Sequence, residues 1–145
     1  MIFENFEFLN DIELEFEGML VSLKAYYEFA GCLAFPLERK VSLNFDPCYP
    51  TLSANDADFP VTLEFLDVER FSTNLNFSDM QPSTGGHVGT GYKEPDDEDM
   101  SYFHDQSMAS KDDHFIVQFD PFGYIRIGAQ SCRLVRRAPV FKALF

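Results

Sequence analysis

Apolar residues at every second position constrain the fold of this chain more than any other feature. In Asp11-Ile12-Glu13-Leu14-Glu15-Phe16-Glu17 the apolar side chains point to one side of a strand and four carboxylates to the other. A helix would scatter the same groups around its circumference, so this segment predicts a strand that carries a row of acids. Further strands are predicted over 19–27, 40–45, 61–66 and 71–77.

Turn residues set the predicted limits of these strands. Gly31 and Pro36 are expected to end the strand over 19–27, and Asp46-Pro47 is typical of a turn that opens a loop over 46–60. Residues 61–66 and 71–77 are expected to be separate strands, joined through Asp67 and Glu69.

The clearest local signal lies late in the chain. Phe115 to Phe119 leads into Asp120-Pro121-Phe122-Gly123, and Tyr124 to Ile127 leads out. Asp, Pro and Gly at the first, second and fourth positions suit a type I turn, so this segment predicts a β-hairpin. Residues 132–135 and 140–145 are predicted to be closing strands. The whole pattern predicts a mainly β fold, an antiparallel β-sandwich or a strongly bent sheet of about eight to nine strands.

A long insertion interrupts the strand pattern. Residues 81–113 hold four glycines, at 85, 86, 89 and 91, followed by the acid run Glu94-Pro95-Asp96-Asp97-Glu98-Asp99. We expect one long acidic loop here, with no strand inside it. The strands that follow are too few to fold alone, so residues 1–145 are predicted to form a single β-rich domain.

Charge indicates the class of partner. Eleven Lys and Arg stand against 24 Asp and Glu, a net charge of −13, and residues 1–120 hold all 24 acids with only six bases, a net of −18. Such a field repels phosphate backbones and anionic membranes, so we expect no nucleic acid and no membrane as a partner. It attracts cationic partners. Solubility is the alternative explanation of the same charge.

Composition favours a cytoplasmic protein. No uncharged apolar run reaches the roughly 20 residues of a membrane span, and Met1-Ile2-Phe3-Glu4 lacks the basic start of a signal peptide. The three cysteines, Cys32, Cys48 and Cys132, are odd in number and widely spaced, which favours reduced thiols.

Catalytic and metal-binding motifs are weak. Nucleophilic catalysis requires a histidine beside a serine or cysteine, whereas His87, His104 and His114 all lie in or beside the insertion and no Gly-x-Ser-x-Gly motif occurs. We therefore expect no enzyme, no catalytic residue and no cofactor. His104, Asp105 and His114 are the strongest metal-ligand alternative, but no Cys-x-x-Cys or His-x-x-x-His spacing supports them, so no metal ligand is assigned.

The hairpin segment Phe115-Ile116-Val117-Gln118-Phe119-Asp120-Pro121-Phe122-Gly123-Tyr124-Ile125-Arg126-Ile127 resembles the late strand, Asp-x-x-Gly turn and strand of small bacterial immunity proteins. These are cytosolic antidotes of contact-dependent inhibition and other polymorphic toxin systems, and several families of them are acidic, β-rich single domains of this length. The resemblance brings no catalytic residues. It implies that the protein occludes a cognate toxin domain, often a basic nuclease, by offering carboxylates where the toxin expects phosphates.

We therefore expect an immunity protein that neutralises a basic toxin domain through an acidic surface. Loop aromatic residues, including Phe59, are the candidate anchors, because affinity requires a few desolvated side chains. The predicted partner-binding residues are Glu13, Glu15, Glu17, Tyr92, Glu94, Asp96, Asp97, Glu98, Asp99, Tyr102 and Phe103. Two alternatives stay open: a metal-binding module or metal-assisted enzyme that uses His104, Asp105 and His114, and a structural protein that assembles through exposed strands.

Overall fold

The computed structural model of the chain describes residues 1–48, 55–75, 89–119 and 123–138. These ranges confirm the mainly β fold and contain ten strands and two short 3-10 helices, which form a curled antiparallel sheet and a small second sheet. The elements are β1 (Ile2–Phe3), β2 (Glu7–Phe8), β3 (Glu13–Phe16), β4 (Met19–Ser22), β5 (Tyr27–Phe35), η1 (Pro36–Glu38), β6 (Lys40–Pro47), β7 (Val61–Thr73), β8 (Gly89–Lys93), η3 (Gln106–Met108), β9 (His114–Phe119) and β10 (Gly123–Arg136).

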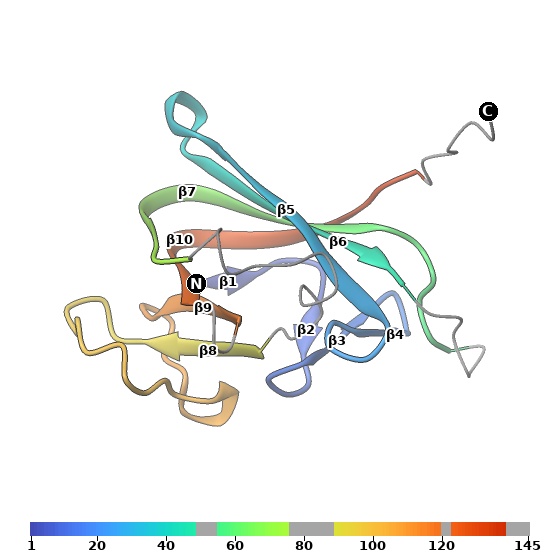
Figure 1. Ribbon diagram of the computed structural model, residues 1–145, viewed down its shortest axis with the longest axis horizontal. Helices are drawn as coiled ribbons and strands as arrows, with labels where there is room; N and C mark the ends of the chain where they lie inside the picture. Colours follow the sequence, from blue (N-terminus) through green and yellow to red (C-terminus); the bar gives the residue numbers. More distant parts are fainter. Residues whose placement is uncertain (49–54, 76–88, 120–122, 139–145) are drawn as a thin grey trace.

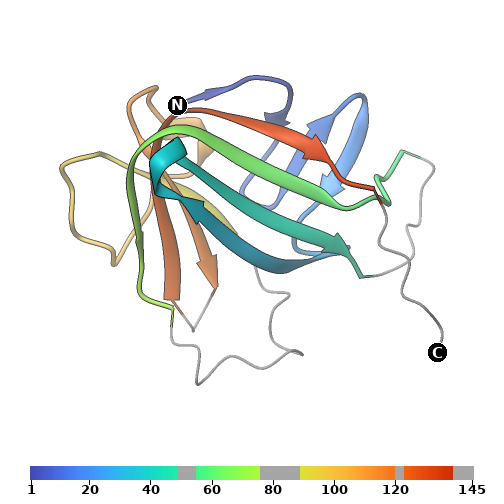
Figure 2. The same ribbon diagram turned by 90° about the horizontal axis from the view of Figure 1, so that it is seen from above.

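The large sheet has the strand order β5-β6-β7-β10-β9-β8, and neighbouring strands along this path are antiparallel. β10 is its longest strand: it pairs with β9 over 123–127 and with β7 over 125–136. β10 continues past His114, the first residue of β9, and on that side it then pairs in parallel with the short strand β1, at Ser131 and Cys132. Figures 1 and 2 show how strongly this sheet curls.

The small sheet, in the order β2-β3-β4, buries its apolar face against the large sheet. Phe8 stacks on Phe115 with ring centroids 5.4 Å apart, and Phe16 meets Phe59 edge-on at 6.2 Å. Leu14 between them is fully buried. Burying one such side chain stabilises the fold by about 1.5–3 kcal/mol, so these contacts hold the two sheets around one apolar core.

The predicted hairpin is confirmed by the pairing of β9 with β10, from Gly123 opposite Phe119 to Ile127 opposite Phe115. The predicted strand over 132–135 is the continuation of β10 rather than a separate strand. Turn residues 120–122 and the predicted strand over 140–145 lie outside the described residues.

The prediction of two strands over 61–66 and 71–77 was wrong for the part of the chain that is described. Residues 61–73 form one strand, β7, and the expected joint is a bulge within it. Gly128 lies opposite Arg70 and Ala129 opposite Val68, so Glu69 is the extra residue. Asp67 has φ 53°, a left-handed conformation that bends the strand without ending it.

The predicted break at Gly31 was also wrong. The expected strand over 19–27 is divided between β4 and the start of β5, and Gly31 lies inside β5, where the register with β6 shifts. Its φ of 150° is one that glycine tolerates and other residues rarely adopt, so the glycine supports a bulge.

The insertion over 81–113 was predicted to hold no strand, and this was wrong. β8 occupies residues 89–93 and pairs with β9, with Tyr92 opposite Phe115. Two glycines in five residues masked the strand pattern in the sequence. Gly91 nevertheless lies close to Phe103: a Cβ at this position would lie 2.9 Å from the Cβ of Phe103. The side chain-free position lets the following loop fold back onto the strand.

Candidate functional site

The first cluster of predicted site residues lies on the outer face of the small sheet. Leu14 and Phe16 point into the core, which leaves the alternate side chains of β3 on the solvent side. Glu15 lies directly opposite Glu7 of β2, and both are exposed, while Glu13 is half-buried. We call Glu7, Glu13 and Glu15 the acidic strand face.

No cation neutralises the acidic strand face within the described residues. The residues opposite it on β4 are Ser22, which faces Glu13, and Leu20, which faces Glu15. None of the ion pairs found within the described ranges includes its carboxylates. Like charges directly opposite each other in a sheet are destabilising by about 0.2–1 kcal/mol, so the arrangement has a cost without an internal benefit.

Glu17 does not extend this row as predicted. β3 ends at Phe16, and Glu17 has φ 52° in the turn that continues through Gly18. The predicted row is therefore shorter than expected, and its third carboxylate comes from Glu7 across the ladder. No prediction included Glu7, because the two-residue strand β2 has too few residues to show an alternation.

The second predicted cluster, the acidic loop over residues 94–99, is organised around a buried arginine. Arg126 of β10 is fully buried. Its Nη1 donates to the carbonyl of Asp97 at 2.8 Å, and its Nη2 donates to the carbonyls of Glu94 at 3.0 Å and Pro95 at 3.2 Å. Its Nε donates to Nδ1 of His114 at 2.9 Å. One guanidinium therefore fixes the backbone of the loop to the sheet.

A buried lysine fixes the other side of the acidic loop. Lys93, the last residue of β8, donates from Nζ to the carbonyl of Tyr102 at 2.9 Å and lies 3.3 Å from Oδ2 of Asp97. The same ammonium lies 3.2 Å from the centre of the Tyr102 ring. The Tyr102 hydroxyl donates to Asp97 at 2.7 Å and, as the largest of several contributions, lowers the pKa of Asp97 to about 2.

Much of the charge in the acidic loop is therefore satisfied internally. Arg70 of β7 donates two hydrogen bonds to the Glu98 carboxylate, at 2.6 and 2.9 Å, and this lowers the pKa of Glu98. Asp99 accepts from the hydroxyl and the amide of Ser101, which lower its pKa. Only Glu94 and Asp96 present carboxylates that none of these contacts engage. The acidic loop is thus less available to a cationic partner than the acidic strand face.

Two of the predicted aromatic anchors are core residues. Tyr92 is 4% exposed and meets the Phe115 ring at 5.9 Å, and Phe59 is 4% exposed beneath the guanidinium of Arg136. The predicted loop position of Tyr92 was wrong, because β8 places this residue on its inner face. Phe59 does lie in a loop, as predicted, but its ring is buried, so neither residue is a free anchor. Phe103 is half-buried against Gly91, and Tyr102 is 48% exposed. Tyr102 is therefore the most exposed of these four candidates, although Lys93 and Asp97 already contact its ring and hydroxyl.

The alternative metal ligands do not converge. His104 pairs its backbone with Tyr92 at the edge of β8, while Asp105 accepts hydrogen bonds from Ser107 at the start of η3. His114 is buried on β9, where its Nδ1 accepts from Arg126, and burial lowers its pKa. Throughout the described part of the chain, no group of three or more His, Cys, Asp or Glu side chains is placed to hold one metal ion.

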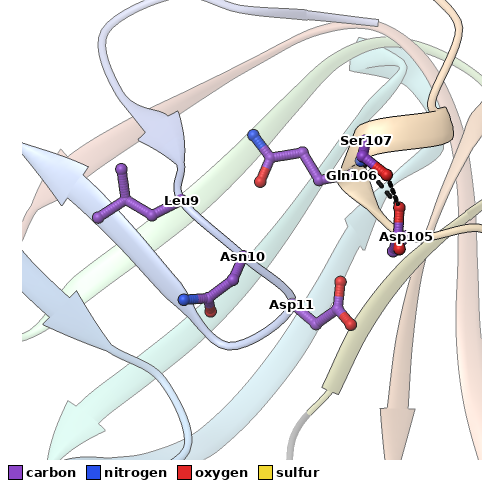
Figure 3. A pocket seen from close by; sticks show the side chains of 6 residues that line it. All are labelled: Leu9, Asn10, Asp11, Asp105, Gln106 and Ser107. Atoms are coloured by element: carbon purple, nitrogen blue, oxygen red, sulfur yellow. Dashed lines mark hydrogen bonds between the residues drawn. The ribbon is translucent and has the colours of Figure 1, made fainter.

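A pocket of about 450 Å³ lies beside the acidic strand face, between the β2–β3 loop and η3 (Figure 3). Asp11 and Asp105 present their carboxylates to it from opposite sides. Desolvation, with a smaller effect from Asp105, raises the pKa of Asp11. Asn10 connects this pocket to the strand face, because its Nδ2 donates to Oε1 of Glu13 at 2.9 Å. The pocket joins segments more than 90 residues apart, so no local pattern of residues could predict it.

No known family model matches the chain, and no curated protein and no solved structure is significantly similar to it. Within the residues described, no helix combines the length and the apolar character that crossing a lipid bilayer requires.

Proposed function

We propose that the chain is a non-enzymatic binding protein, an antidote of the immunity class, which docks a basic toxin domain on its acidic strand face. One observation carries the proposal. Glu7, Glu13 and Glu15 lie together on paired strands without a cationic partner among the described residues, whereas Glu64, Asp97 and Glu98 each lie within 4 Å of an internal cation.

Electrostatics explains what this face can do. A partner that brings lysines and arginines relieves the repulsion between Glu7 and Glu15, and so gains both attraction and relief of strain in the sheet. The net charge of −13 steers a cationic partner toward the molecule and speeds association by about 10- to 1,000-fold at low salt. The strand backbones are fixed by the core beneath, so the face is preformed.

The neighbouring pocket supplies a place for one long side chain of the partner. Its carboxylates, Asp11 and Asp105, suit a guanidinium or an ammonium group. Leu9, 49% exposed on the pocket wall, offers apolar surface for the alkyl part of that side chain. Affinity then comes from a few desolvated contacts at the pocket and speed from the strand face.

The test is co-purification with the polypeptide that the neighbouring gene encodes, followed by measurement of the association rate of the two proteins. In the variant E7Q/E13Q/E15Q the association rate at low salt should fall about tenfold, because the steering charge is lost. The matched control E38Q/D58N/E69Q removes the same charge from exposed acids elsewhere and should change the rate by less than about twofold. Equal effects of the two variants, or no salt-sensitive complex at all, would refute the proposal.

A further inference from the structure

β5 is an edge strand whose free side has no backbone partner among the described residues. It is the terminal strand of the large sheet and pairs only with β6. The opposite edge is closed differently: in β8, Tyr92 exchanges backbone hydrogen bonds with His104, and Thr90 donates to the carbonyl of Asp11. Among the described residues, one edge of the sheet is thus covered and the other is open.

Apart from its bulge beside Gly31, the open edge carries few of the usual devices against pairing. Proteins blunt free edges with lysine, proline or several charges, but Glu28 is the one charged residue in the nine of β5. Leu33 is 54% exposed and Phe35 is 37% exposed on the same strand. The hairpin of β5 and β6 ends at η1 and projects from the rest of the sheet (Figure 1). A long, apolar, accessible edge is a template for another strand.

We propose that this edge pairs with the β5 edge of a second copy of the chain, in antiparallel orientation, to form a dimer. Charge favours a second copy here over the basic partner of the acidic strand face. Residues 27–47 hold three acids and two bases, a net of −1, although the whole chain carries −13. This hairpin is therefore a region where two copies can approach without strong repulsion, and the inference is independent of the proposed function.

Antiparallel pairing also brings opposite charges together. It places the Glu28 end of one strand beside the Phe35 end of the other, because the two strands run in opposite directions. Lys40 lies directly across from Phe35 on β6, with its ammonium 4.8 Å from the centre of the Phe35 ring and 3.5 Å from Glu38. Two-fold symmetry repeats the contact, so each dimer gains two pairings of Glu28 with Lys40 of the other copy.

Sedimentation equilibrium of the full chain tests the dimer. The wild type should show a monomer–dimer equilibrium at protein concentrations up to about 1 mM. L33K puts a charge on the edge at an exposed position and should abolish the dimer, whereas the control L37K, at the fully exposed tip outside the strand, should leave it unchanged. A monomer throughout that range, or a dimer that L33K leaves intact, would overturn the inference.

A charge exchange gives a second measurement that does not depend on how L33K folds. E28K or K40E alone should weaken the dimer about tenfold, since each replaces two attractive contacts with repulsive ones. The double variant E28K/K40E should recover most of the wild-type dimerisation. Failure of the double variant to recover, with circular dichroism showing intact β structure, would refute the antiparallel arrangement.

Discussion

Arg126→Met is the most informative single change to the fold around the acidic loop. Methionine fills a similar volume but makes none of the five hydrogen bonds that the guanidinium donates, to His114, Glu94, Pro95, Asp97 and the sulfur of Met100. The change leaves several neutral acceptors without a donor, and because each such buried acceptor costs about 1–3 kcal/mol, we expect a total cost of about 3–5 kcal/mol. For a chain of this size we expect Tm to fall by about 10–20 °C.

Urea unfolding gives the free energy, and hydrogen exchange of the amides of residues 94–100 reports the loop itself. Arg133→Met is the matched control on the same strand: the Arg133 side chain is 48% exposed, and its ion pair with Glu64 at 2.6 Å is a surface contact worth about 0–1 kcal/mol. A cost below about 1 kcal/mol for Arg126→Met, or one equal to that of the control, would show that the guanidinium does not hold the loop.

Three further outcomes follow from the same contacts. Burial, and next the charge of Arg126, lower the pKa of His114 in the folded chain, so the unfolded chain takes up the proton first and stability falls as the pH drops below about 6.5. His114→Asn should therefore flatten the pH dependence of the unfolding free energy between about pH 7.5 and 5.5, and an unchanged slope would contradict this. Tyr92→Ala should cost about 3–5 kcal/mol in urea unfolding, and a cost under about 1 kcal/mol would mean that the side chain is not in the core. Tyr102→Phe should raise the pKa of Asp97 above about 2, as measured by NMR of the Asp97 carboxyl carbon. An unchanged pKa would exclude the Tyr102 hydroxyl as the main cause of the low pKa.

The alternation of residue types predicted the strand-rich fold and the late hairpin, because these depend on local spacing. Strand continuity was harder to predict. Glu69 becomes the extra residue of a bulge because β10 continues beside β7 on both sides of it, and Gly31 lies inside β5 because β6 holds the strand on either side. Local sequence shows a possible break, and only the partner strand determines whether the strand ends there.

The negative charge of the candidate site was predictable from the sequence, but the internal cations that neutralise part of it were not. The acids on β3 were visible in the sequence, yet Arg126 and Lys93 gave no sign that they bind the acidic loop, since those contacts exist only after β8 and β10 take their places in the sheet. The same folding buries Tyr92. The run of acids over residues 94–99 therefore suggested more unpaired charge than the folded loop presents. Among the described residues, Glu7, Glu13 and Glu15 on two short strands are in no ion pair, whereas Asp97 and Glu98 are.

The most direct test of this account is the electrostatic potential near each backbone amide, measured by NMR from the paramagnetic relaxation that cationic and anionic nitroxides cause. We expect the most negative potential at Glu7, Glu13 and Glu15, and a weaker one at Asp97 and Glu98, whose carboxylates lie beside Lys93 and Arg70. A potential over residues 94–99 as negative as that over the strand face, or more so, would contradict it.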